Sequence, residues 1–432
     1  MGSVLQNLKE QTKVKLRENL NQKYITRLLN IIASKPVVLA YANTFSSKSD
    51  KYLNVFSLKQ IKNAYSAHSP TAYGSLFLPY ELFYSLDILP FLPEVIAGYS
   101  AGLGLADKTL KKASSNWYSQ DLCTFHRSAS GAVELDLFPK PTFIICTSLA
   151  CDAAQKSFYL YAKNYGIEDN FYLLDVPYSH TSESVPYLSK QIKNLSMDIC
   201  KKLGKKLDIN KFKEAIELSN EFREWAIKVN DLRKTLVDYP LNYNGLNFIL
   251  PFHGLAGSKD GVTLYKEMYK EFSRCLKKQK AENSSTKKTP KRILWLHLKP
   301  YYKNEIFQTL EEENCKVVFE EINYVYWDKL DPDRPFYSMA QKMLSHYLRG
   351  KIENRIDAIL NMAKNYKIDG AILLSHWGCR QSNGGARIIK DSLNQYNIPT
   401  LVLDTDCVDQ NNSSKGQIKT RIQSFTEILN SK

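Results

Sequence analysis

The residues of this sequence best suited to redox or metal chemistry are its eight cysteines. No two of them form a CxxC pair, so a metal site must be assembled from distant parts of the chain. Thiolate sulfur is a soft ligand that suits zinc or an iron–sulfur cluster. The alternative is that each cysteine is a small buried hydrophobic residue, which is the commoner role of a free thiol.

Alternating apolar segments predict the elements that position these cysteines. Short apolar runs predict strands at residues 142–147, 171–176, 292–298, 316–322, 369–375 and 399–404. Single helices are predicted at residues 79–86, 117–133, 152–165, 304–313, 385–396 and 417–429, and two helices over residues 336–366. Residues 91–96 are expected to be extended. This alternation predicts an α/β fold with two doubly wound, flavodoxin- or Rossmann-like domains built on parallel sheets.

The same patterns divide the chain into four regions. Residues 1–70 are an N-terminal helical region, with amphipathic helices expected over residues 1–35, and residues 71–180 are the first α/β domain. Residues 181–290 are a helical insert followed by a lysine-rich linker, and residues 291–432 are the second α/β domain. Within the insert, apolar residues recur every three or four positions over residues 212–236, which is typical of a packed helix face.

The predicted strands sort the cysteines by position. In open parallel sheets, ligands bind outside the carboxyl ends of the strands. Four cysteines lie at such ends, and a fifth, Cys123, lies near the start of a helix in the first α/β domain; the four are Cys146, Cys151, Cys379 and Cys407. The other three fall inside helices or open a strand, where a structural thiol is expected; they are Cys200, Cys275 and Cys315.

Composition and missing motifs exclude several classes of protein. The net charge of +15 comes from scattered lysines, and no zinc-finger or RNP-type motif accompanies them, so no nucleic-acid partner is expected. Neither GxGxxG nor GxxxxGK[ST] follows a predicted strand, which argues against a dinucleotide site or a P-loop. The apolar stretch 82–106 is broken by charges and prolines, and residues 1–20 lack the apolar core of a secretory signal. We therefore expect a cytoplasmic protein with no membrane partner.

A series of motifs in chain order resembles a known superfamily. The motifs are Pro79-Tyr80-Glu81-Leu82, Cys123 with Arg127 and Gly131, Cys151-Asp152, Asp369-Gly370 leading to His376-Trp377-Gly378-Cys379, residues 398–406, and residues 416–421. From about Leu76 to the C-terminus, the series resembles the 2-hydroxyacyl-CoA dehydratase superfamily, which includes benzoyl-CoA reductase subunits and double-cubane-cluster reductases. The motifs identify the superfamily and leave the substrate open.

The resemblance implies a cofactor, a reaction and partners. It implies a 4Fe–4S cluster between two α/β domains, held by three cysteines that match Cys123, Cys151 and Cys379. It also implies a second, paralogous dehydratase subunit and an ATP-hydrolysing activator iron–sulfur protein that supplies one electron at very low potential. That electron would convert the thioester carbonyl of an (R)-2-hydroxyacyl-CoA to a ketyl radical anion, which then loses water. Such a subunit is a lyase.

Further residues are expected near the chemistry. Glu81 matches the family position nearest to it and is our candidate catalytic residue, as a proton-handling or orienting group; a helix N-terminal carboxylate is the alternative. His126 and His376 flank predicted ligands and either polarise sulfur or pack in the core. The loop at residues 381–385 precedes a helix and could hold a phosphate of coenzyme A.

Two alternatives to the single-cluster dehydratase stay open. Cys146 and Cys407 are extra thiols at strand ends, so the chain supplies five of the six cysteines that a double-cubane cluster needs. A double-cubane or benzoyl-CoA-type reductase is the second hypothesis. A non-catalytic subunit that relays electrons within a dehydratase heterodimer is the third.

Overall fold

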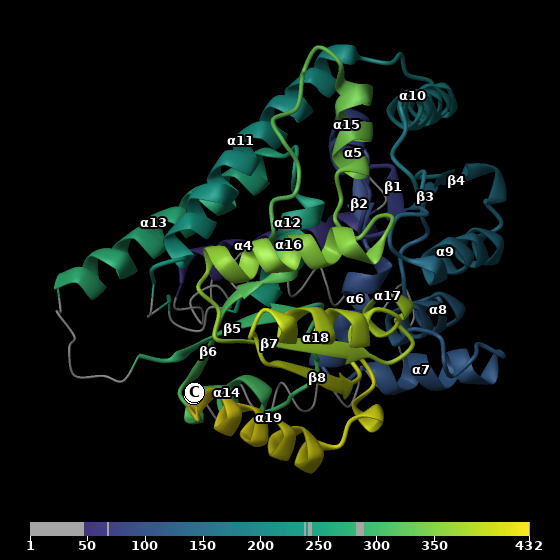
Figure 1. The fold of residues 1–432 in the computed structure, drawn as a ribbon. Coiled ribbons are helices and arrows are strands. Elements are labelled where there is room, and N and C mark those ends of the chain that lie inside the picture. Colours follow the sequence, from purple (N-terminus) through teal and green to yellow (C-terminus); the bar gives the residue numbers. More distant parts are fainter. Residues whose placement is uncertain (1–46, 67–68, 237–238, 241–243, 282–288, 432) are drawn as a thin grey trace, which may run out of the picture.

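The structure is a computed structural model and describes residues 47–66, 69–236, 239–240, 244–281 and 289–431. Two four-stranded parallel sheets organise this part of the chain (Figure 1). The first contains β1 (Thr71–Gly74), β2 (Leu89–Phe91), β3 (Phe143–Thr147) and β4 (Phe171–Leu174). The second contains β5 (Lys291–Leu296), β6 (Cys315–Glu320), β7 (Gly370–His376) and β8 (Thr400–Thr405). The predicted α/β fold class is confirmed.

Both sheets have the same strand order. The first runs β2-β1-β3-β4 and the second β6-β5-β7-β8, with every neighbouring pair parallel. In this order the chain leaves the first strand in one direction and the third strand in the other. A crevice therefore opens between the carboxyl ends of β1 and β3, and another between those of β5 and β7.

Helices cover both faces of each sheet. Between β1 and β4 lie α5 (Glu81–Ser85), α6 (Pro93–Gly102), α7 (Ala106–Ser115), α8 (Thr124–Glu134) and α9 (Asp152–Tyr165). Around the second sheet are α14 (Ile306–Glu312), α16 (Ile352–Asn365), α17 (Arg380–Asn383), α18 (Ala386–Gln395) and α19 (Lys415–Asn430). The helix α15 (Pro335–Leu344) instead packs in the core cluster that includes β3 and β4 of the first sheet. Successive residues of β5 face opposite sides, so Trp295 packs in the cluster that includes α14 and α19, whereas Leu294 packs with α16 and α18.

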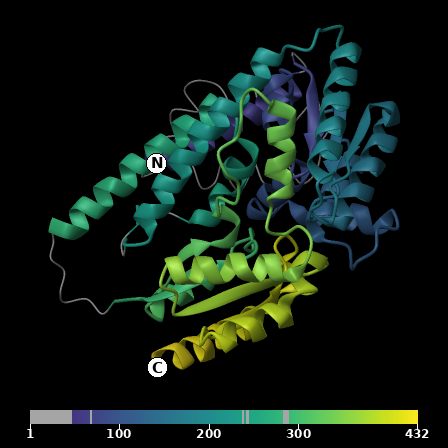
Figure 2. The same ribbon diagram turned by 45° about the horizontal axis from the view of Figure 1, so that its top comes forward.

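A helical layer joins the two sheets. It contains α4 (Lys48–Tyr65), α10 (Ser184–Lys202), α11 (Ile209–Arg233), α12 (Ile249–Gly254) and α13 (Lys259–Ala281). The long helices α11 and α13 lie side by side in both ribbon views (Figures 1 and 2), and α10 packs against α15 of the second half. Among the described residues, no helix is both long enough and apolar enough to cross a bilayer.

Several local predictions were wrong for identifiable reasons. Residues 91–96 were expected to be extended, but α6 begins at Pro93, because proline is well suited to the first turn of a helix. The helix predicted from residue 117 begins only at Thr124, and Trp117 adopts a left-handed conformation with φ 67°. Strand β1 was missed because its four residues are too few to show a period. The helices expected over residues 1–35 lie outside the described residues.

Candidate functional site: a thiol and imidazole centre

The crevices of the two sheets bring together residues from both halves of the chain. Cys151 follows β3, His297 follows β5, and Cys379 comes three residues after His376, the last residue of β7. Cys123 lies at the start of α8. The three predicted cluster cysteines are all helix N-cap residues: Cys123 caps α8, Cys151 caps α9 and Cys379 caps α17. Unpaired backbone N–H groups at a helix N-terminus favour negative charge, so these positions suit thiolates.

Each of these thiols is paired with one imidazole. Cys123 Sγ lies 3.4 Å from His376 Nε2, and Cys151 Sγ lies 3.4 Å from His126 Nε2. Cys379 Sγ lies 3.5 Å from His297 Nε2. The sequence indicated the first two histidines as neighbours of the cysteines.

The thiols lie close enough together for their neighbours to affect the ionisation of Cys123 and Cys151. Burial raises the pKa of the Cys123 thiol well above its usual value, and the nearby Cys379 and Cys151 raise it further. The pKa of Cys151 is raised for the same reasons, by burial and then by Cys379. Three thiolates would therefore repel one another here, and a positively charged inorganic group is what would stabilise all three.

The chemical type of these donors therefore fits an iron–sulfur cluster, because all three are half-buried or buried thiols at helix N-termini. Within the described residues, no three His, Cys, Asp or Glu side chains are already arranged around a common ion position. Each sulfur instead contacts its imidazole. The assignment of Cys123, Cys151 and Cys379 as ligands stays a prediction.

His376 is held more firmly than the other two histidines. Its Nδ1 accepts a hydrogen bond of 3.1 Å from the backbone N–H of Cys407 and lies 3.8 Å from Asp406 Oδ1. Its backbone N–H donates to Ser382 Oγ, and its carbonyl accepts from Asn383 Nδ2. Those two side chains belong to the loop that was expected to hold a phosphate, and here they fix the end of β7.

The two α/β units touch directly at this centre. Thr124 Oγ1 donates to Asp406 Oδ1 at 2.6 Å, and Trp377 Nε1 donates to the carbonyl of Gln120 at 3.0 Å. Gly378 packs against the turn that precedes Cys123. Its φ is +72°, and a Cβ there would lie 2.6 Å from both the carbonyl oxygen of Asp121 and the amide nitrogen of Cys123. Only glycine combines this backbone conformation with so close an approach.

Replacing Gly378 with alanine is therefore expected to push the two units apart. The free energy of unfolding should fall by more than in Gly204→Ala, where φ is also positive, at +64°, but a Cβ meets nothing within 4 Å. The control variant, Gly204→Ala, should lose only the free energy of the strained backbone conformation, about 1 kcal/mol. Chemical denaturation of both variants measures the difference. Equal losses would show that the contact between Gly378 and residues 121–123 is not tight.

A buried carboxyl lies beside the centre. Glu94 Oε1 is 4.0 Å from His126 Nε2, and Glu94 Oε2 is buried with no hydrogen-bond partner among the described residues. Burial raises the pKa of Glu94 to about 8, while backbone N–H groups, including that of Leu76, oppose the rise. Burial also lowers the pKa of His126 to about 4, so the imidazole is neutral near pH 7. A neutral histidine beside a largely protonated carboxyl adds no charge to the thiols.

Glu81 lies in a second polar cluster. Its side chain is fully buried, and Oε1 accepts hydrogen bonds from Lys342 Nζ at 2.6 Å and Ser219 Oγ at 2.5 Å. Glu81 Oε2 is buried and has no partner among the described residues. The ammonium of Lys342 also lies 4.5 Å from the centre of the Trp327 ring.

The loop after β1 separates the two clusters. The amide of Leu76 faces Glu94 beside the thiols, whereas the ring of Phe77 packs against the imidazoles of His253 and His346. Burial and the charge of Lys342 lower the pKa of His253 to about 3. The polar cluster around Lys342 and the thiol centre are thus neighbours across one short segment.

The remaining thiols are mostly buried. Cys146 lies inside β3, and burial together with Glu94 raises its pKa to about 12. Cys407 lies behind His376, and its pKa is raised by burial, by Asp406 and by Cys123 and Cys379. Cys200 and Cys275 lie within α10 and α13, and Cys315 opens β6, as predicted.

Sequence reasoning missed His297, Glu94 and Lys342. His297 directly follows the observed end of β5, and its positive φ of 73° places it in a sharp turn. The predicted strand over residues 292–298 included it, so the rule applied to the cysteines did not select it. No local pattern marks Glu94 or Lys342, because their partners lie far away in the sequence.

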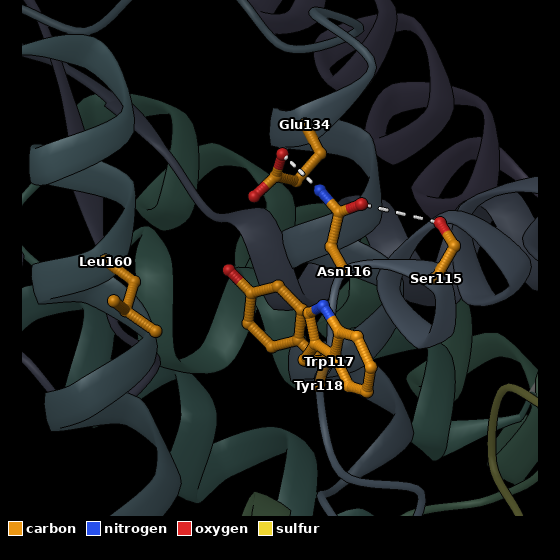
Figure 3. A pocket seen from close by; sticks show the side chains of 6 residues that line it. All are labelled: Ser115, Asn116, Trp117, Tyr118, Glu134 and Leu160. Atoms are coloured by element: carbon orange, nitrogen blue, oxygen red, sulfur yellow. Dashed lines mark hydrogen bonds between the residues drawn. The ribbon is translucent and has the colours of Figure 1, made fainter.

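The surface also carries an open cavity of about 420 Å³ (Figure 3). Its lining residues are Ser115, Asn116, Trp117, Tyr118, Glu134 and Leu160. Asn116 Nδ2 donates to Glu134 Oε2 at 2.7 Å, and the indole of Trp117 is almost fully exposed. None of the thiols lines this cavity, so the cysteine chemistry lies elsewhere.

Comparison with known proteins gives a consistent result. Residues 75–429 match the family described as 2-hydroxyglutaryl-CoA dehydratase, D-component. The alpha subunit of (R)-phenyllactyl-CoA dehydratase from Clostridium sporogenes is 22% identical over 366 residues, covering 81% of this chain and 87% of that one. One of the benzoyl-CoA reductase subunits from Thauera aromatica is 21% identical over 378 residues, covering 82% and 87%.

A further relative is matched along nearly its whole length. The alpha subunit of (R)-2-hydroxyisocaproyl-CoA dehydratase from Clostridioides difficile is 22% identical over 396 residues, covering 87% of this chain and 95% of that one. The predicted superfamily is confirmed, and the chain belongs to the 2-hydroxyglutaryl-CoA dehydratase D-component family.

Proposed function

We propose that this chain is the iron–sulfur subunit of a 2-hydroxyacyl-CoA dehydratase, a hydro-lyase that removes water from an (R)-2-hydroxyacyl-CoA. One observation carries the proposal: three N-cap cysteines from two α/β units lie together at the crevices of their sheets. Family membership supports the reaction class.

In this proposal Cys123, Cys151 and Cys379 hold one 4Fe–4S cluster. The cluster supplies a one-electron carrier and an iron, free of cysteine, that acts as a Lewis acid toward the substrate. Binding the cluster relieves the repulsion that, together with burial, raises the pKa values of Cys123 and Cys151. The helix N-termini of α8 and α9 add favourable dipoles.

The proposed reaction balances without net oxidation. One electron converts the thioester carbonyl to a ketyl radical anion, which expels the hydroxyl group from C2 and becomes acidic at C3. A proton then leaves C3, the electron is returned, and the products are the enoyl thioester and water. An ordinary thioester is scarcely acidic at C3, so elimination without the electron has no accessible carbanion.

Glu81 is the proposed proton-handling group. Its Oε2 is buried and carries no hydrogen bond from the described residues, so a lone pair is available, while Lys342 and Ser219 hold the other oxygen. The loop of residues 75–80 connects this carboxylate to the thiol centre. Packing of this loop is what would fix the proton acceptor relative to the substrate.

We also propose two protein partners: a paralogous second dehydratase subunit, and an ATP-hydrolysing activator protein that delivers the electron. Similar proteins are named as subunits, which supports an assembly of more than one chain. Potentials of typical ferredoxins, on the order of −400 mV, do not readily reduce a thioester, so coupling to ATP hydrolysis is needed.

A reductase of the benzoyl-CoA or double-cubane type is the second candidate. Two observations favour it: a benzoyl-CoA reductase subunit is among the relatives, and the buried thiol of Cys407 lies close enough to Cys123 and Cys379 to have its pKa raised by them. A role as an electron-relay subunit of a dehydratase heterodimer needs the same cysteines.

Anaerobic purification tests the proposal directly. We expect about four iron and four sulfide ions per chain, measured colorimetrically after acid release. About eight irons per chain would favour the double-cubane alternative. A colourless preparation, or one that contains zinc in place of iron, would contradict both the dehydratase proposal and the double-cubane alternative.

A further inference from the structure

We infer that His126, His297 and His376 are positioning residues that donate N–H···S hydrogen bonds, one to each of the three cysteine sulfurs, and so raise the reduction potential of the group that these sulfurs hold. His376 also couples this potential to the contact between the two α/β units. The inference rests on the proposed function, because it concerns the cluster that the three cysteines would bind.

The tautomer of His376 follows from its surroundings. The backbone N–H of Cys407 donates to Nδ1 at 3.1 Å, so Nδ1 carries no proton. An imidazole ring with no proton on Nδ1 carries its proton on Nε2. Nε2 therefore donates its N–H to Cys123 Sγ, 3.4 Å away.

The other two histidines favour the same tautomer. Nδ1 of His126 and Nδ1 of His297 are buried and have no hydrogen-bond partner among the described residues. A proton on Nδ1 would leave a buried donor unsatisfied there, and unpaired N–H groups are rarer in proteins than unpaired acceptors. The proton therefore belongs on Nε2, which faces Cys151 in one case and Cys379 in the other.

Three donors of this kind have a predictable electrostatic effect. Each places the positive end of an N–H dipole at a sulfur whose negative charge grows when an electron is added. The reduced state is then stabilised more than the oxidised one, and the reduction potential rises. Hydrogen bonds to cluster sulfurs are an established determinant of such potentials.

Of the three pairs, only that of His376 with Cys123 joins the two α/β units. His126 and Cys151 both belong to the first, and His297 and Cys379 both belong to the second. A change in the packing of Gly378 on residues 121–123 would lengthen the His376 hydrogen bond and leave the other two intact. The potential would then fall when the units separate.

The test measures the potential in iron-loaded protein. In His376→Leu the N–H donor is lost, and we expect the midpoint potential, measured by redox titration with EPR detection, to become more negative. His376→Gln places an amide N–H near the position of Nε2 and should restore most of the wild-type potential. His126→Leu and His297→Leu should each shift the potential in the same direction as His376→Leu.

Two controls separate this role from a structural one. His253→Leu removes another buried imidazole, one that contacts none of the three cysteines, and should leave the potential unchanged. In iron-free wild-type protein, ¹⁵N NMR should find the proton on Nε2 of His376, a result that does not depend on a variant folding. A proton on Nδ1, or equal potentials in iron-loaded His376→Leu and wild type, would overturn the inference.

The inference and the proposed function fail in different ways. Wild-type protein without iron contradicts the proposed function. Wild-type protein with the expected iron, but with potentials that do not respond to the three histidines, contradicts the inference alone.

Discussion

Cys379→Ser is expected to lose most of its iron and the visible absorbance that accompanies it. A serine oxygen is a harder ligand than thiolate and binds iron–sulfur clusters poorly. The fold should survive, because Cys379 is the N-cap residue of α17 and serine is a preferred N-cap residue. Loss of iron would then report the missing sulfur and not unfolding. Iron content and circular dichroism of the anaerobically purified variant measure the two effects separately.

Cys200→Ser is the matched control. Cys200 is buried within α10 and contributes to a hydrophobic core cluster that is separate from the thiol centre. This variant should keep the wild-type iron content and absorbance. If both variants retain iron equally, the assignment of Cys379 as a ligand is wrong. If both lose it, the cluster depends on folding in general and the comparison does not support a specific ligand.

Lys342→Met is expected to lower the free energy of unfolding by about 3–5 kcal/mol, the usual cost of removing one partner from a buried ion pair. Glu81 would keep a buried carboxylate with Ser219 as its remaining hydrogen-bond partner. Methionine has a similar length and can still pack against Trp327, so loss of charge is the main change. Urea denaturation of the two proteins measures the difference.

The double variant Glu81→Gln with Lys342→Met should recover part of this loss, because no buried charge is left without a partner. Lys213→Met provides the exposed control: its partner Asp333 is 81% exposed, and the change in stability should be small. A Lys342→Met variant as stable as Lys213→Met would show that Glu81 is not held as a buried carboxylate by Lys342.

These two predictions differ in what the sequence could reveal. Cys379 was identified from its position after a predicted strand, before any knowledge of its neighbours. The buried pair between Glu81 and Lys342 spans 261 residues, and no pattern in either segment indicates the other. Glu81 was found only through its motif, with a helix N-terminal position as the alternative. It is the first residue of α5, and its charge is nevertheless paired far from its own helix.

The sequence by itself determined the fold class and where most strands end. Buried parallel strands are short apolar runs, and amphipathic helices repeat every three to four residues, so both leave a local signal. The boundaries of α9, from Asp152 to Tyr165, were predicted correctly because Gly166, in the left-handed conformation, ends the helix. Parallel strands align their carboxyl ends, so the rule for ligand sites selected four candidate cysteines, and only the resemblance singled out Cys151 and Cys379 among them.

Only the tertiary structure decided which side chains meet. His376 and Cys123 are 253 residues apart and belong to different α/β units, and their contact depends on how one unit is placed on the other. That placement comes from non-local packing, such as Gly378 against residues 121–123, and from the buried link between Thr124 and Asp406. Local periodicity carries no information about it, because the same strands and helices could form with the two sheets in another arrangement.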